Sequence, residues 1–276
     1  MDGPDSSRHE QIAQTGFPFQ IAVANQIRDS QSEHGWKVLA PEVPWAHGFI
    51  DIVIARYEGP VVAIECKRAV LKAGPPQQWI FTSSNGECGE TSDVRVEMIF
   101  LAGVHRASAS PEELERRISS VKARFEPSGP CADFCAYPKT GGPSGSFEKV
   151  AGELVASAHD LLRQPKWLPP GDPEAPLAIY PIVVTNAELY VCTFDGGSSI
   201  LTTGNPNTSR YERRPVVRFQ KSLVNYDTRH HIDKALPLDL WVRERERTII
   251  VVEASELTTF LRSFAARSQL PDAGVM

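Results

Sequence analysis

Two apolar runs with a short polar segment between them are the clearest feature of the hydrophobic pattern in this chain. Residues 48–55 and 61–68 are rich in Val and Ile, and the segment 56–60 between them contains Gly and Pro. This pattern predicts two β-strands joined by a tight turn. Strands that are apolar on both faces belong in a core, where an unpaired ion costs on the order of several kcal/mol. Asp51, Glu65 and Lys67 interrupt these runs and therefore need compensating partners.

The length of the turn decides whether these three side chains meet. Side chains alternate across a strand, so Glu65 and Lys67 share one face while Cys66 points to the other. A three-residue loop at 57–59, with its glycine in the left-handed position, places Asp51 opposite Glu65. A two- or four-residue loop shifts the register by one and sends Asp51 to the other face. The candidate site therefore depends on the three-residue loop.

The rest of the chain shows both helical and strand periodicity, which predicts an α/β protein. A helical stripe begins near Phe17 and runs to about Ser32, and Gly35 ends it. Residues 1–14 are polar and are expected to be disordered. The other expected elements are strands at 36–39, 94–102, 177–185, 188–194, 215–219, 238–243 and 248–253, helices at 110–125, 146–163 and from Ser255, and loops at 41–47 and 129–145.

Two carboxylates and a lysine at one place provide the chemistry that phosphodiester hydrolysis requires. Carboxylate oxygens bind Mg²⁺, which neutralises charge that develops on the phosphate and helps to generate hydroxide from water. An ammonium group two residues beyond a metal ligand orients or activates the water and contacts the phosphate. The alternative is a structural ion pair between Lys67 and Asp51 or Glu65.

In this placement, Asp51, Glu65 and Lys67 resemble the D…ExK signature of the PD-(D/E)XK, or restriction-endonuclease-like, nuclease superfamily. The resemblance covers about residues 15–70 and 146–195. It implies an α/β fold with an αβββαβ core, in which helices flank a mixed central sheet. The nuclease-like domain would span 15–195 with an insertion at 71–145, and 196–276 would be a C-terminal α/β extension packed on the core.

The resemblance also implies a role for each residue of the motif. Asp51 and Glu65 would hold Mg²⁺ or Mn²⁺, with the main-chain carbonyl of Cys66 as a further ligand. Lys67 would assist the attacking water.

Two positions depart from the pattern of the superfamily. Many relatives carry a Glu on the first helix that reaches the metal, and the matching position here is Gln20. As a catalytic residue Gln20 would hold a metal-bound water, although its neutral amide compensates the cation less, and the alternative is an ordinary glutamine at the edge of the helix. Ile50 stands where a proline often precedes the Asp. His47 is near the motif in sequence, although a histidine in a loop is more often incidental.

The implied activity is that of a metal-dependent endonuclease acting on DNA, with RNA as a possible substrate, in restriction or antiphage defence. A homodimer is expected, because a subunit with one site needs a second copy to cut both strands. A protein partner or effector that activates the enzyme is a further expectation. The alternative function is a catalytically inactive nuclease-like fold that binds nucleic acid or a protein inside a larger complex.

Composition changes this picture little. The chain has 276 residues, of which 41% are hydrophobic and 23% charged, as in ordinary globular proteins. It contains no run long enough to cross a bilayer and no N-terminal signal peptide, so a cytoplasmic protein without membrane contact is expected. Five cysteines argue against a disulfide scaffold, and the spacing of Cys131, Cys135, Cys88 and His105 is too loose to predict zinc.

The net charge of −5 indicates that any contact with nucleic acid depends on a local basic patch. The candidates for this patch are Arg210, Arg213, Arg214, Arg218, Lys221, Arg243, Arg245 and Arg247. For each of them taken singly, a solvated loop or strand edge is the more ordinary interpretation.

Overall fold

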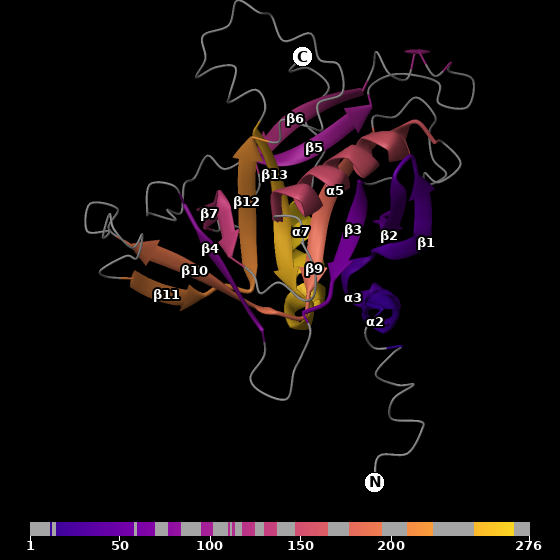
Figure 1. Cartoon of the computed structure of the whole chain (residues 1–276). Helices are drawn as coiled ribbons and strands as arrows, with labels where there is room; N and C mark the ends of the chain where they lie inside the picture. Colours follow the sequence, from indigo (N-terminus) through magenta and orange to yellow (C-terminus); the bar gives the residue numbers. More distant parts are fainter. Residues whose placement is uncertain are drawn as a thin grey trace, which may run out of the picture.

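The computed structural model describes residues 12, 15–57, 60–69, 77–83, 95–101, 110, 112–113, 118–124, 130–136, 147–164, 177–194, 209–222 and 246–267. Their strands form a nine-stranded mixed sheet and a smaller four-stranded sheet, and helices lie against the larger sheet (Figure 1). The expected α/β class with a mixed sheet flanked by helices is confirmed at this level.

The elements are as follows. The large sheet contains β1 (Lys37–Trp45), β2 (Gly48–Ala55), β3 (Val61–Lys67), β5 (Arg95–Leu101), β6 (Ile118–Arg124), β7 (Cys131–Ala132), β9 (Leu177–Thr185), β12 (Val216–Ser222) and β13 (Glu246–Glu253). The small sheet contains β4 (Gln78–Thr82), β8 (Phe134–Ala136), β10 (Glu188–Phe194) and β11 (Ser209–Arg213). The helices are α2 (Phe17–Asp29), α3 (Gln31–His34), α5 (Phe147–Leu162), the 3₁₀ turn η4 (Ala254–Glu256) and α7 (Leu257–Arg267).

The centre of the large sheet is parallel, and its N-terminal side is antiparallel. The strand order is β1-β2-β3-β9-β13-β12-β7, with β5 and β6 joined to β9. β1, β2 and β3 pair antiparallel, whereas β3 and β13 each pair parallel with β9. The carboxyl ends of β3, β9 and β13 therefore meet at the same edge of the sheet.

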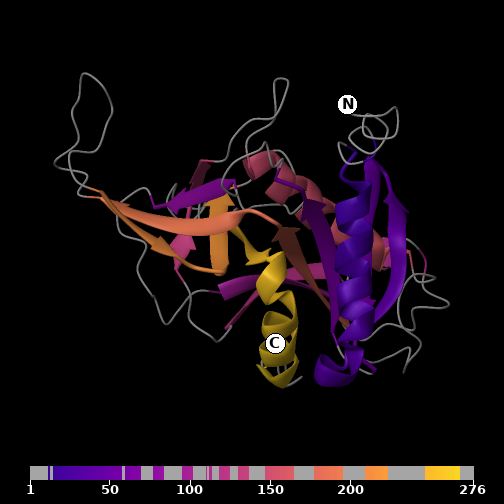
Figure 2. The ribbon, with the colours of Figure 1, turned by 90° about the horizontal axis from the view of Figure 1, so that it is seen from below.

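Two hydrophobic cores hold the helices on opposite faces of this sheet. Helix α5 packs on one face, where its buried Phe147 contacts the rings of Trp79, Phe81 and Phe219. Helices α2 and α7 pack on the other face and lie side by side, as Figure 2 shows. Gly35 ends the α2–α3 segment in the left-handed conformation at φ 74°, as expected from the sequence.

Three expectations about secondary structure are wrong. Residues 118–124 form strand β6, paired with β5, where a helix at 110–125 was expected. Its expected start is present, since residues 112–113 are helical and Ser110 Oγ accepts from Glu113 N at 3.2 Å. The segment 41–45 belongs to β1, an edge strand that tolerates its prolines. The expected loop 129–145 contains β7 and β8.

The remaining expectations agree with the structure or concern residues outside the described ranges. Strands 177–185 and 188–194 have the expected bounds, and the helices expected at 146–163 and from Ser255 correspond to α5 and to η4 with α7. Strand β11 was not expected. The strand expected at 238–243 and most of segment 1–14 lie outside the described residues.

Candidate functional site

The hairpin has the register that the three-residue loop predicts. Ile52 pairs with Ile64 and Ala55 with Val61, and Arg56 N donates to Pro60 O at 3.4 Å. Continuing this register by one pair places Asp51 opposite Glu65, on the same face of the sheet. The alternative in which Asp51 points to the far face is therefore wrong.

Asp51 lies at the point where β2 and β3 stop pairing. Its Oδ2 accepts a hydrogen bond from Cys66 N at 2.6 Å. Burial and then the Glu65 carboxylate raise the pKa of Asp51 to about 7, against the opposing effects of the Cys66 N–H and Lys67. Negative charge at this position is therefore incompletely compensated by the protein.

Lys67 and Glu65 form a close ion pair, with 2.5 Å between Nζ and Oε1. Burial alone would lower the pKa of Lys67, but Glu65 and then Asp51 outweigh it and raise that pKa. Lys67 therefore carries its positive charge at neutral pH. Its side chain keeps 37% of its surface exposed, so a ligand arriving from solvent can reach the ammonium group.

Gln20 reaches the same place from helix α2. The residue is buried, and its Nε2 donates to the main-chain oxygen of Asp51 at 2.8 Å. The sequence placed Gln20 at the first-helix position that often carries a metal-reaching Glu. In this structure its amide holds the main chain of β2 and so fixes the position of Asp51.

Glu42 is a third carboxylate that sequence reasoning missed. Pro41 pairs with Ile52 and Val43 with Ile50, so Glu42 lies opposite Asp51 on the outer side of β2. Its charge is a further cause of the raised pKa of Asp51, and its φ of 47° is rare for a residue with a side chain. The segment was expected to be a loop because of its two prolines, and this concealed the register.

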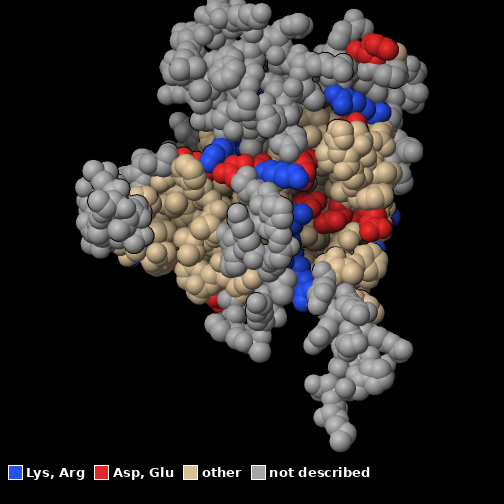
Figure 3. All heavy atoms as spheres, in the orientation of Figure 1, with Lys and Arg blue, Asp and Glu red and all other residues tan. Residues whose placement is uncertain are grey.

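Acidic and basic groups are concentrated on this part of the molecule. Figure 3 shows charged side chains of both signs in two neighbouring groups, one over α5 and one over β1–β3. The large uncharged areas of the same view lie to either side. A surface of this kind suits a ligand that carries charge of its own.

The carboxyl edge of the parallel strands continues the site across the sheet. Lys67 is in register with Thr185, and Thr185 with Glu253, so the three residues form a row. Asn186, in the turn after β9, accepts from Ala69 N at 2.6 Å and donates to Ala69 O at 3.3 Å. These two bonds hold the chain immediately after Lys67.

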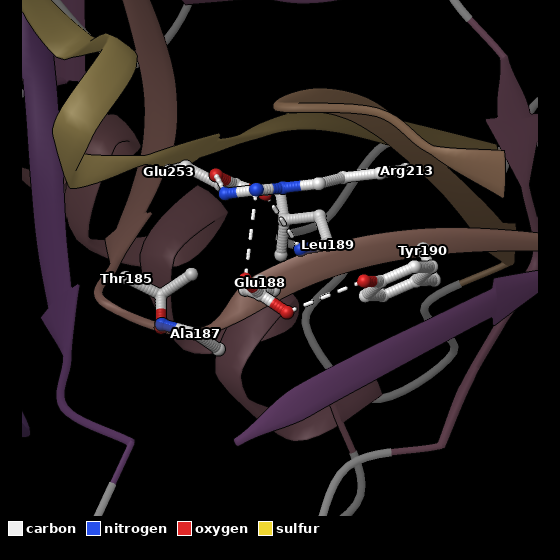
Figure 4. Close-up of polar contacts among 7 residues, drawn as sticks. All are labelled: Thr185, Ala187, Glu188, Leu189, Tyr190, Arg213 and Glu253. Atoms are coloured by element: carbon white, nitrogen blue, oxygen red, sulfur yellow. Dashed lines mark hydrogen bonds and ion pairs between the residues drawn. The ribbon is translucent and has the colours of Figure 1, made fainter. Parts of the chain in front are cut away.

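Glu253 connects the large sheet to the small one, as Figure 4 shows. This buried carboxylate accepts from Leu189 N at 2.8 Å and from the guanidinium of Arg213 at 2.8 and 3.3 Å. Arg213 also lies 3.5 Å from Glu188, which accepts from the Tyr190 hydroxyl at 3.3 Å. The end of β13 is therefore tied to both strands of the β10–β11 pair.

Several residues of the predicted basic patch pair with carboxylates, while Arg210 is exposed on β11. Arg213 pairs with Glu253, Arg214 with Glu212 at 2.9 Å, and Lys221 with Glu148 at 2.8 Å. Arg218 is buried, and Arg243 and Arg245 lie outside the described residues. Local pairing with carboxylates explains why these cations do not form a uniformly positive surface.

The other candidates from the sequence lie apart from the site. His47 is exposed and packs edge-on against Trp45 at 5.2 Å. Cys131 and Cys135 lie on different sheets, while Cys88 and His105 are not among the described residues. Burial, followed by the charges of Asp51 and Glu65, raises the pKa of the Cys66 thiol well above its usual range, so this thiol is not a ready nucleophile.

The chemistry of the donor set fits a hard divalent cation. Asp51 and Glu65 provide two carboxylates against the single ammonium group of Lys67, and burial together with the Glu65 carboxylate raises the pKa of Asp51. Within the described ranges no three His, Cys, Asp or Glu side chains form a metal cluster. Mg²⁺ often binds through one or two carboxylates and keeps several waters, so two suffice.

Comparisons with family models, curated proteins and solved structures gave no match to this chain. Among the helices described here, none has the length and apolar character that crossing a bilayer requires.

Proposed function

We propose that this protein is a metal-dependent nuclease of the PD-(D/E)XK type that hydrolyses phosphodiester bonds of DNA. The observation that carries the proposal is the register that sets Asp51 opposite Glu65, with Lys67 two residues along the same strand. The D…ExK resemblance requires this arrangement. A loop one residue shorter or longer would have placed Asp51 on the other face of the sheet.

Each residue has a separate part in the proposed reaction. Asp51 and Glu65 hold the cation, and Gln20 and the Cys66 N–H fix the position of Asp51. Bound Mg²⁺ would stabilise charge on the phosphate and acidify water. Lys67 stays positively charged, because its raised pKa keeps it protonated. It therefore orients water and phosphate as a hydrogen-bond donor.

The reaction is hydrolysis and needs no other reactant. A water oxygen forms a bond to phosphorus and the water gives up one proton to the solvent. The bond from phosphorus to one sugar oxygen breaks, and the leaving oxygen takes up one proton, so that the protons balance. Lys67 stabilises the growing negative charge only if it turns from Glu65 toward the phosphate. The exposed part of its side chain allows this movement.

The test is cleavage of supercoiled plasmid by the purified protein in Mg²⁺ or Mn²⁺, with EDTA as the blank. Asp51→Asn and Lys67→Met preserve size and should each lower the rate of nicking at least about 100-fold. Lys37→Met, at the exposed start of β1, should cut like the parent. Equal cutting by the parent and both site variants would contradict the proposal.

A second function has a specific observation in its favour. The neutral Gln20 bonds to the main chain and adds no metal-binding charge, as expected for an inactive nuclease-like fold that binds nucleic acid or a protein. Thermal unfolding with and without Mg²⁺ separates the two functions. Stabilisation of the parent but not of Asp51→Asn supports the metal site, and no stabilisation together with no cleavage supports the binding subunit.

A further inference from the structure

Arg68 contains a buried donor with no acceptor. It follows Lys67 directly, beyond the end of β3, and its Nη1 is buried without a hydrogen-bond partner in the structure described here. A guanidinium keeps its charge at all physiological pH values and has five N–H groups to satisfy. A buried, unsatisfied donor of this kind calls for an explanation, and a bound anion is one of the few available.

Neighbouring cations at this edge are satisfied by carboxylates of the protein. Lys67 pairs with Glu65 and Arg213 with Glu253. The protein thus has carboxylates at hand for these cations, but none is placed on Nη1 of Arg68. An anion from outside that binds this nitrogen breaks no hydrogen bond within the protein.

The main chain on both sides of Arg68 is held in place. Lys67 is paired with Thr185 of β9, and Ala69 exchanges two hydrogen bonds with the Asn186 side chain, at 2.6 and 3.3 Å. The main chain of Arg68 is therefore held between two fixed neighbours. When a ligand binds, the side chain of Arg68 has to be ordered but its main chain already has a fixed position.

We propose that Arg68 binds a backbone phosphate of the nucleic acid, next to the phosphate on which Lys67 acts. This inference rests on the proposed nuclease function and adds a substrate-binding residue to it. The planar guanidinium matches two oxygens of one phosphate, and the side chain is partly exposed, so it can turn outward to meet the ligand. The phosphate oxygens then supply the acceptors that Nη1 lacks.

The test measures binding of a fluorescent DNA duplex as a function of salt concentration. Ca²⁺ replaces Mg²⁺, and a gel confirms that the duplex stays intact. Loss of one phosphate contact in Arg68→Met should weaken binding roughly tenfold and reduce the slope of log K against log salt by about 0.9. Arg68→Lys keeps the charge and should preserve the slope with a smaller loss of affinity.

Arg262→Met is the matched control, because Arg262 lies on α7, is exposed and is paired with Glu33 of α3. It should bind with the slope of the parent. Thermal unfolding should show Arg68→Met to be at least as stable as the parent, since the change removes an unsatisfied buried donor.

An unchanged salt slope in Arg68→Met, with a parent that cleaves, overturns this inference alone. A parent that neither cleaves nor binds the duplex removes the proposed function as well. If Arg68→Met does not fold, Arg68→Lys provides the test. An affinity for the duplex equal to that of the parent would then overturn the proposed contact between the planar guanidinium and two phosphate oxygens.

Discussion

At the scale of single residues, Asp51 shows a conflict between stability and chemistry. Its carboxylate is packed beside Glu65 and faces Glu42 across the strand, and among the described residues Lys67 and the Cys66 N–H compensate its charge. Groups of this kind are found at functional sites because folding alone would not favour them.

The first prediction concerns the pH dependence of stability. Because the folded pKa of Asp51 is about 7, above its ordinary 3.8, the native state binds a proton more tightly than the unfolded state. The contribution of Asp51 to the free energy of unfolding is therefore complete below about pH 4. It falls as the pH rises and is lost above pH 7. Asp51→Asn should raise the free energy of unfolding at pH 8 by about 1–2 kcal/mol and flatten the dependence between pH 4 and 7.

Urea unfolding at pH 5 and pH 8 measures this effect. Asp29→Asn, at the exposed end of α2, serves as the control and should leave the difference between the two pH values unchanged. A less stable Asp51→Asn at pH 8 would show that the carboxylate is better compensated than its surroundings indicate.

At the scale of elements, the two-residue turn after β9 has two structural roles. Asn186 binds the chain beyond Lys67, and Ala187 N bonds to Thr185 Oγ1 at 3.1 Å. The next strand, β10, then enters the small sheet while β9 stays in the large one. The turn therefore connects the two sheets and holds the end of the strand that carries Glu65 and Lys67.

Asn186→Ala tests whether Asn186 holds the chain beyond Lys67. Loss of two hydrogen bonds to Ala69 should lower the free energy of unfolding by about 1–3 kcal/mol. Because the end of β3 is then less fixed, kcat for plasmid nicking should fall about tenfold. Asn25→Ala, which removes only an exposed contact with Arg28, should change neither quantity, and a kcat equal to that of the parent would rule out a positioning role for Asn186.

The link between the sheets can be measured with Arg213 and Glu253. Arg213→Met leaves the buried Glu253 with only the Leu189 N–H among the donors described, and should cost about 1–3 kcal/mol, reduced because Arg213 is half exposed. Glu253→Gln in the same chain should restore part of that loss. Denaturant unfolding of the four proteins gives the coupling energy, and additive losses would mean that the ion pair contributes nothing.

The sequence predicted the positions of Asp51 and Glu65 better than the contacts around them. Alternation and loop length determine the register of Asp51 against Glu65, since both are local properties of one hairpin. Glu42 was missed because prolines on an edge strand look like a loop. The contacts of Arg213, Asn186 and Glu253 join segments far apart in the chain, and no local pattern reports such pairings.

The helix expected at 110–125 shows the same limit among the elements. Its capping serine and acidic first turn are real local signals, yet residues 118–124 pair with β5. Pairing within the sheet satisfies a whole row of backbone groups and outweighs the preference of one turn. The apolar strands 177–185 and 188–194 were predicted with correct bounds because local preference and burial agree there.

At the scale of the whole molecule, the C-terminal segment is part of the core. Strand β13 lies between β9 and β12, and Trp36 Nε1 donates to Leu261 O of α7 at 3.0 Å. The ring of Phe264 lies 5.5 Å from Trp36 and 4.9 Å from Tyr180. Residues from both ends of the described chain therefore share one core.

Phe264→Ala should consequently lower the free energy of unfolding by about 3–5 kcal/mol, because the side chain is fully buried and leaves a cavity. Phe49→Ala is the matched control, since Phe49 is 61% exposed and should cost far less. Chemical denaturation measures both. A small loss at Phe264 would mean that α7 packs only loosely on α2 and the sheet.

The central pairing of β9 with β13 also has a consequence for biosynthesis. Ile182 meets Ile250, and Val61 meets Ile179, so the middle of the sheet closes only across long stretches of chain. A nascent chain on the ribosome has Asp51, Glu65 and Lys67 long before it has the strand that bears Glu253. Any activity of this edge must therefore appear late, after translation has passed β13, and products of premature termination should lack it.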